Sequence, residues 1–265
     1  MADLSEVFSG GIGYVMLSRI QNIEQLILIG GSHLDKVYPS EKALEALTTM
    51  LKKTSGSAKP SIVNEVKILG CNIRSLPAHH QDFLLEPMIT DADVILLQQT
   101  CLTKNDSERQ FVIDGLANHF NSIANGKGLV THFKENFRYV ADISELEYQM
   151  TLIRSKSVDI VNIYRSSSFS REGKQKFVQH LIFLLDPSKK VLVFGDFNED
   201  YPDKTISQEL KEFGFEQHVK QPTHIRGHLI DQVWTLNIDT EKVILEHFPV
   251  YFTDHDMFFI RIDLT

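Results

Sequence analysis

The stretch VLVFGDFNED, from Val191 to Asp200, decides the fold that we predict for this chain. It starts with an unbroken run of strand-forming apolar residues, which is typical of a strand buried on both faces. The run ends at Gly195, and Asp196 and Asn198 follow. Because residues i and i+2 of an extended chain point the same way, these two side chains would project together from the strand end. Such a carboxylate and amide can hold a water molecule against an electrophile, but an ordinary turn explains the same residues equally well.

Similar apolar runs recur from residue 66 to the end of the sequence, with helical patterns between some of them. The alternation of strands and helices predicts sheets covered by helices in one layered α/β domain. We expect strands at 66–71, 93–97, 128–133, 137–141, 148–154, 158–164 and 257–264. We expect helices at 79–88 and about 205–213, and a third that follows a polar loop at 166–175 and runs to about 185.

The composition is that of an ordinary globular protein. The chain has 265 residues, of which 42% are hydrophobic and 23% charged, and its net charge is −8. This charge argues against a surface coated in Lys and Arg, but it leaves room for a local basic groove. No run of about 18 apolar residues is present, so we expect no membrane span. Two cysteines, Cys71 and Cys101, fit a reducing, intracellular compartment.

Residues 1–56 are expected to form a separate piece, joined by a linker at 57–65. The stretch YVMLSR, from Tyr14 to Arg19, resembles the last conserved motif of superfamily-1 DNA helicases. In those helicases the matching arginine reaches the γ-phosphate of ATP. The sequence contains no Gly-x-x-x-x-Gly-Lys-Ser/Thr loop to cradle a nucleotide, so we expect neither ATP binding nor helicase activity.

Polar residues follow many of the predicted strands. Each of them has an ordinary explanation as a turn, a cap or a surface residue. Ligands and chemistry nevertheless gather where the ends of strands converge on one edge of a sheet. The residues concerned are Asn72, Gln99, Tyr164, Asp196, Asn198, Asp231, Asp254 and His255.

These residues lie in six short motifs that, in order and spacing, resemble those of the endonuclease/exonuclease/phosphatase superfamily. The motifs are CNIRSL, ILLQQT, VNIYRSS, GDFN, PTHIRGHLIDQVW and TDHD, and the match in their order and spacing extends over roughly residues 66–265. The resemblance implies a four-layer α/β sandwich, in which two packed, mostly antiparallel β-sheets are flanked by helices. Together with the helicase-like stretch, it is similar to the helicase–endonuclease fusions of Helitron-like (Helentron) transposons.

The resemblance also implies roles for individual residues in phosphodiester hydrolysis. Asn72 and residue 99 would hold Mg²⁺, with Mn²⁺ as an alternative, and Asp254 would lie on the metal side. The metal would neutralise the phosphate and stabilise the leaving oxygen. Asp196, aided by Asn198, would orient and deprotonate the attacking water. Asp231 would position His255 against a phosphate oxygen, to which Tyr164 would also donate a hydrogen bond.

One position departs from the family pattern, which has glutamate where this chain has Gln99. Mg²⁺ is a hard cation that is usually held by one or two carboxylates. Glutamine keeps a carbonyl oxygen but lacks the negative charge, so we expect weaker Mg²⁺ binding and reduced turnover. The chain is then an impaired copy, an altered variant or an enzyme that works with a lower metal affinity.

DNA is the expected partner. Arg165, Arg171, Lys174 and Arg226 are candidate phosphate contacts, although each of them also fits a solvated surface. The favoured function is a DNA endonuclease of mobile-element origin in the nucleus. The alternatives are a catalytically silent nucleic-acid-binding remnant and a phosphatase or phosphodiesterase that acts on a small or lipid substrate. The oligomeric state stays open.

Overall fold

The computed structural model describes residues 64–103, 106–121, 127–168, 170–202 and 206–265. The predictions for residues 1–56, including the helicase-like stretch, lie outside the described residues. The same holds for the predicted linker up to residue 63. The strand that follows it begins at Glu65, one residue before the predicted start.

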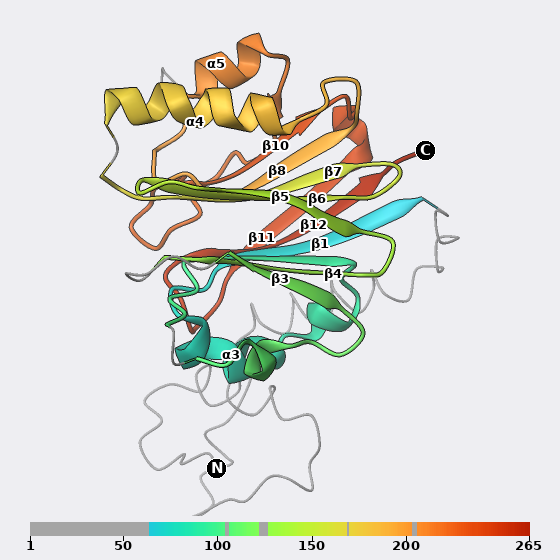
Figure 1. The fold of residues 1–265 in the computed structure, drawn as a ribbon, viewed down its shortest axis with the longest axis vertical. Coiled ribbons are helices and arrows are strands. Elements are labelled where there is room, and N and C mark those ends of the chain that lie inside the picture. The colour runs from blue at the N-terminus through green and yellow to red at the C-terminus, as the bar shows by residue number, and fades with distance from the viewer. Residues whose placement is uncertain (1–63, 104–105, 122–126, 169, 203–205) are drawn as a thin grey trace, which may run out of the picture. The chain divides into compact units, whose positions relative to one another are not determined.

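The described residues form two six-stranded sheets that lie face to face (Figure 1). In each sheet one pair of neighbours is parallel, β1 with β2 and β7 with β8, and the other pairs are antiparallel. The first sheet has the order β11 (Val243–Pro249), β12 (Asp256–Asp263), β1 (Glu65–Asn72), β2 (Val94–Gln98), β4 (Leu129–Phe133) and β3 (Ala117–Asn121). The second has the order β5 (Arg138–Ser144), β6 (Tyr148–Arg154), β7 (Asp159–Arg165), β8 (Val191–Asp196), β10 (Asp231–Leu236) and β9 (Glu216–Gln217).

Helices cover the outer face of each sheet (Figure 1). Helices α4 (Arg171–Leu184) and α5 (Ile206–Glu212) pack on the second sheet, and α3 (Leu76–Leu84) packs on the first. Short 3₁₀ turns lie at η3 (Pro87–Thr90), η4 (Glu108–Phe111) and η5 (Thr240–Lys242). The predicted four-layer sandwich is therefore confirmed. None of these helices in the described part of the chain is long and apolar enough to cross a membrane.

Three apolar clusters hold the layers together. The central one fills the space between the sheets and includes Ile68 and Phe194, both fully buried. The second joins α4 and α5 to their sheet, and the third joins α3 to the other. A strand such as Val191–Phe194 contributes to two clusters because its successive side chains point to opposite faces. This explains why the sequence has a continuous apolar run there.

Some predicted boundaries were wrong. The helix expected at 79–88 spans Leu76–Leu84, because the Ser75 side chain caps its start by accepting a hydrogen bond from the Ala78 N–H at 3.4 Å. A separate 3₁₀ turn follows, beginning at Pro87, whose ring cannot continue a helix. Strands β3, β9, β10 and β11 were not among the expected strands. Strands β3 and β11 carry polar residues and are largely half-exposed at the sheet edges, and β9 has only two residues. Strand β10, DQVWTL, is buried but mixes polar and apolar residues.

Candidate active site

The strand ends bring the predicted catalytic residues to one end of the sandwich. On the second sheet, Asp196 of β8 is paired with Tyr164 of β7 on one side and with Asp231 of β10 on the other. These three residues therefore form one row across the sheet. On the first sheet, Asn72 ends β1 opposite Gln98 of β2, so Gln99 follows at the same edge.

The backbone turns sharply just after several of these strands. Arg74, Gln99, Cys101 and Asn198 have φ angles of 58°, 50°, 54° and 47°. This left-handed conformation costs a residue with a side chain on the order of 1 kcal/mol. Strained backbone of this kind gathers at functional sites because the surrounding structure has to hold it in place. The turns aim polar groups from both sheets at the same place.

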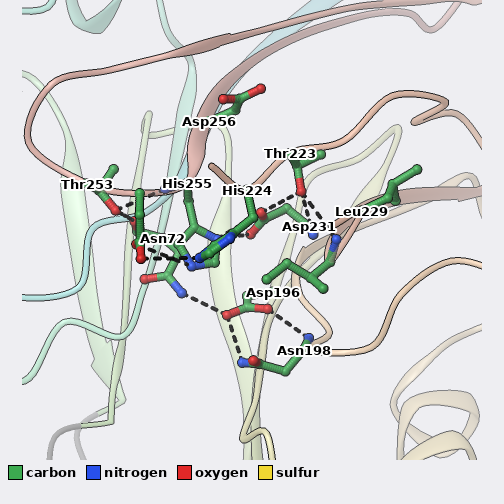
Figure 2. Close-up of polar contacts among 12 residues, drawn as sticks. Asn72, Asp196, Asn198, Thr223, His224, Leu229, Asp231, Thr253, His255 and Asp256 are labelled. Atoms are coloured by element: carbon green, nitrogen blue, oxygen red, sulfur yellow. Dashed lines mark hydrogen bonds and ion pairs between the residues drawn. The ribbon is translucent and has the colours of Figure 1, made fainter. Parts of the chain in front are cut away.

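Asp196 is the centre of the site and is almost fully buried, with 1% of its surface exposed. Its Oδ2 accepts hydrogen bonds from the side-chain amides of Asn72 at 2.8 Å and Asn198 at 2.9 Å. Its Oδ1 accepts from the backbone N–H of Asn198 at 2.7 Å (Figure 2). Burial and the nearby negative charge of Asp231 raise the pKa of Asp196, against the opposing effect of His255 and these hydrogen bonds. The carboxylate is thus fixed in orientation and has the character of a base suited to neutral pH.

His255 and Asp231 form a buried pair beside Asp196. The Nδ1 of His255 lies 2.9 Å and 3.1 Å from the two carboxylate oxygens of Asp231. Thr223 donates its hydroxyl hydrogen to Asp231 at 2.8 Å and so fixes the carboxylate from the other side (Figure 2). Burial opposes the imidazolium charge, but the charge and hydrogen bond of Asp231, together with the charges of Asp196 and Asp254, raise the pKa of His255 to about 9. The ring is therefore positively charged at neutral pH, and its Nε2 is directed away from Asp231.

Tyr164 lies at the edge of this cluster and is 7% exposed. Burial raises its pKa to about 12, and the charge of Asp196 acts in the same direction. Its hydroxyl therefore stays protonated at neutral pH and can donate a hydrogen bond.

The residues expected on the metal side are Asn72, Gln99 and Asp254. Asn72 donates its amide hydrogens to Gln99 Oε1 at 3.2 Å and to Asp196, and its Oδ1 accepts from the Arg74 N–H at 3.1 Å. Asp254 Oδ2 accepts from the Arg74 guanidinium at 2.7 Å and lies 3.2 Å from His224 Nε2. Burial opposes ionisation of Asp254, but the charges of His255 and Arg74 keep its pKa below the usual range.

The donor set can be tested for its fit to a metal ion. Two groups of acidic and His residues have ligand atoms within 4.8 Å of one another among the described residues, His224–Asp254–His255 and Asp196–Asp231–His255. In the second group both oxygens of Asp231 are already bonded to His255 and Thr223. In the first, His224 Nδ1 accepts from the Arg226 N–H, so a neutral ring carries its proton on Nε2 and has no lone pair there. Neither of these two groups is therefore ready to bind a metal ion.

An oxygen-only site remains at Asp254. Its Oδ1 is buried and has no hydrogen-bond partner among the described residues, although His255 Nε2 lies 3.8 Å away. Gln99 Oε1 accepts one hydrogen bond from Asn72 and keeps a second lone pair. One carboxylate oxygen and an amide oxygen suit a hard divalent ion that takes its other ligands from water and a substrate phosphate. The residues present fit such an ion, with less negative charge than a site containing two carboxylates.

The four candidate phosphate contacts fall into different environments. Arg165 is 3% exposed, and its guanidinium donates to the carbonyl oxygens of Phe197 and Asn198, so it braces the loop after β8 and does not face solvent. This corrects its expected contact with DNA. Lys174 pairs with Glu199. Arg226 is exposed at a tight turn whose Ile225 N–H donates to the Asp254 carbonyl at 2.9 Å. Arg171 begins α4, and its side chain lies outside the described residues.

Three residues at the site were missed or misjudged from the sequence. Thr223 orients Asp231, Arg74 pairs with Asp254, and His224 contacts Asp254. Thr223 and His224 belong to the PTHIRGHLIDQVW motif, which was a signal that more than its aspartate is functional. Arg74 lies two residues after Asn72, but its partner is 180 residues away in the sequence.

No protein-family model and no curated protein matches the sequence of this chain. Solved structures match its fold. The endonuclease domain of TRAS1, a telomere-specific non-LTR retrotransposon, is 15% identical with a TM-score of 0.56, over 76% of this chain and 99% of that chain. An AP endonuclease from Archaeoglobus fulgidus is 14% identical with a TM-score of 0.59, over 75% of this chain and 99% of that chain.

A third similar structure is a variant of the 3′ phosphatase NExo from Neisseria, bound to a product DNA hairpin. It is 13% identical with a TM-score of 0.60, over 75% of this chain and 99% of that chain. An endonuclease/exonuclease/phosphatase family protein from Leptotrichia buccalis is 12% identical with a TM-score of 0.56, over 74% of this chain and 99% of that chain. The described residues of this chain therefore have the fold of endonuclease/exonuclease/phosphatase proteins.

Proposed function

We propose that this chain is a metal-assisted phosphodiester hydrolase that nicks DNA. The observation that carries the proposal is the buried cluster of Asp196, Asp231 and His255, in which a fixed carboxylate lies next to a fixed imidazolium. A base and a positively charged donor held side by side are what hydrolysis of a phosphodiester requires.

In the proposed reaction, Asp196 accepts a proton from water while the water oxygen forms a bond to phosphorus. The bond from phosphorus to the leaving oxygen breaks, and that oxygen takes a proton from solvent. Asn72 and Asn198 hold the Asp196 carboxylate in its orientation. His255 donates to the phosphate oxygen that gains charge, and Tyr164 donates a second hydrogen bond. Asp254 and Gln99 would hold Mg²⁺ or Mn²⁺, with Asn72 beside them, and the ion would neutralise the phosphate and the leaving oxygen.

The nature of the substrate rests on the similar structures. Two of them are named as endonucleases, and a third holds a DNA hairpin. The TRAS1 domain belongs to a retrotransposon, which agrees with the mobile-element origin that we propose from the helicase-like stretch. A protein with this function would act in the nucleus.

The test is a nicking assay on supercoiled plasmid with Mg²⁺ or Mn²⁺. The natural chain is expected to produce nicked circles, and Asp196→Ala to lose at least about 100-fold in rate, because it removes the base. Asp263→Asn, a carboxylate change at the far end of β12, is the matched control and should leave the rate unchanged. Equal nicking by the natural chain and Asp196→Ala would overturn the proposal. Turnover of an inositol phosphate without DNA cleavage would favour a small phosphate ester as the substrate.

A second function, a silent DNA-binding domain, is favoured by two observations at the metal side. Gln99 is neutral, and Asp254 is already paired with Arg74. Gln99→Glu separates the two functions because it restores a carboxylate without changing length. If this variant nicks plasmid and the natural chain does not, the natural chain is silent. If the natural chain nicks well, silence is excluded.

A further inference from the structure

We propose that the guanidinium of Arg74, one of two cationic groups beside Asp254 together with His255, competes with the divalent metal ion for this carboxylate. This inference rests on the metal site proposed above. It assigns to Arg74 a role that the sequence motifs do not indicate: Arg74 sets how tightly the site binds metal.

The contact that carries the inference is the ion pair between Arg74 Nη1 and Asp254 Oδ2, at 2.7 Å. Asp254 is the one carboxylate on the metal side among the described residues, because position 99 is glutamine. A divalent ion bound at Asp254 Oδ1 would therefore share its single carboxylate with a guanidinium on the neighbouring oxygen, and it would lie near His255 Nε2, which is 3.8 Å from Oδ1. Like charges so close repel each other, and the pairing with Arg74 also reduces the negative charge that the carboxylate offers to the metal.

Arg74 is not a mobile surface residue that meets Asp254 by chance, because its backbone is fixed on both sides. Its N–H donates to Asn72 Oδ1 at 3.1 Å, and its carbonyl oxygen accepts from Cys101 Sγ at 3.2 Å. Its φ angle of 58° turns the chain sharply after β1. The residue is thus held by the same asparagine that contacts Asp196 and Gln99.

The side chain of Arg74 is nevertheless 53% exposed, whereas that of Asp254 is 24% exposed. The guanidinium can therefore leave Asp254 for solvent without opening the core. Because this ion pair is held in place but accessible to solvent, a metal ion at high concentration can displace the guanidinium from Asp254. At low metal concentration the arginine itself neutralises the carboxylate.

The test measures Mn²⁺ binding directly, by the electron paramagnetic resonance signal of free Mn²⁺, with no substrate present. Arg74→Gln is expected to tighten Mn²⁺ binding about tenfold, because it removes the competing charge. Arg74→Lys should stay close to the natural chain, because it keeps the charge. Arginine, glutamine and lysine are all unbranched at Cβ, so the backbone turn at residue 74 is equally strained in the natural chain and in both variants. Circular dichroism and a urea transition confirm that each variant folds.

The control for the mechanism is Asp254→Asn. In an Arg74→Gln/Asp254→Asn double variant the gain in Mn²⁺ affinity should disappear, because the competition takes place at that carboxylate. The inference is overturned if Arg74→Gln binds Mn²⁺ no more tightly than the natural chain, or if Arg74→Lys gains as much as Arg74→Gln. Because binding is measured without turnover, an inactive protein can still support this inference, and a nicking protein can still contradict it.

Discussion

At the scale of the residue, the most informative group is His255. In the folded protein its pKa is about 9, compared with 6.5 for an ordinary histidine. A histidine with a raised pKa stabilises the fold while it is protonated in the folded state. This contribution is fully present below about pH 6.5 and is lost as the pH rises to about 9. A shift of this size corresponds to on the order of 3 kcal/mol.

We therefore expect the free energy of unfolding to fall between pH 6.5 and 9, and His255→Asn to remove most of that fall. Urea denaturation at several pH values measures the free energy of unfolding of both proteins. His228→Asn is the matched control, because His228 also pairs with an aspartate but its side chain is 52% exposed. Burial raises the pKa of Cys71 above 9.0, so Cys71 also lowers the free energy of unfolding as the pH rises, but only at higher pH. The pH range in which His255 explains the fall therefore ends at about pH 9. An identical slope in the natural chain and His255→Asn would contradict the expectation.

The sequence predicted the residues of this site better than their partners. Asp196, Asp231 and His255 could be found because they lie in recognisable motifs, although only Asp196 ends its strand, whereas Asp231 begins β10 and His255 precedes β12. The pairing of Arg74 with Asp254 could not, since it depends on how a turn after β1 faces a loop from the far end of the chain. Arg165 was misjudged for a related reason: its charge suggested solvent, but the turn after β8 presents carbonyl oxygens that bury it.

At the scale of the element, β8 carries the site because it is packed tightly against β7. A Cβ added to Gly195 would lie 1.9 Å from the carbonyl oxygen of Ile163, its neighbour on β7. No real side chain tolerates such a contact with backbone, so one of the two strands would have to move. Asp196 is the next residue, so any shift would displace the carboxylate from Asn72 and Asn198.

Gly195→Ala is therefore expected to destabilise the protein by about 3 kcal/mol and to lower nicking in parallel. Urea denaturation measures the first effect and the plasmid assay the second. Gly115→Ala is the matched control: Gly115 has a φ of 81° but would place its Cβ in open space, so it should cost only about 1 kcal/mol. Equal losses from the two substitutions would show that backbone conformation, and not the close approach of β7 and β8, explains the effect.

Burial explains only part of which elements were predicted, since the half-exposed edge strand β5 was predicted and the buried strand β10 was not. Strand β8 was clear because both of its faces are covered, and β3 and β11 were missed because they lie at the edges and carry polar residues. The apolar pattern does not say which strand faces which across the sandwich. For that, the rare polar residue inside an apolar strand is the better signal, and Asn162 in the run Asp159–Arg165 is such a residue.

At the scale of the whole molecule, Asn162 links the two sheets. It lies on β7 and is 0% exposed. Its Oδ1 accepts from Gln98 Nε2 on β2 at 2.7 Å. Its amide donates to Thr131 Oγ1 at 3.1 Å and to the carbonyl oxygens of Leu97 and Val130, each at 3.3 Å. These contacts fix the relative position of the sheets, and the site depends on that position because Asn72 and Asp196 come from different sheets.

Asn162→Leu is expected to lower the free energy of unfolding by about 3 kcal/mol, because it leaves a buried amide on Gln98 and two backbone carbonyls short of partners. It should also reduce nicking more than its stability loss explains at a temperature where the variant is fully folded. The control is Asn136→Ala on an exposed turn, which should change stability by less than about 0.5 kcal/mol. If Asn162→Leu is destabilised but nicks at the natural rate when folded, the sheets keep their register without it. The site then depends on the apolar layer between the sheets, and not on this polar link.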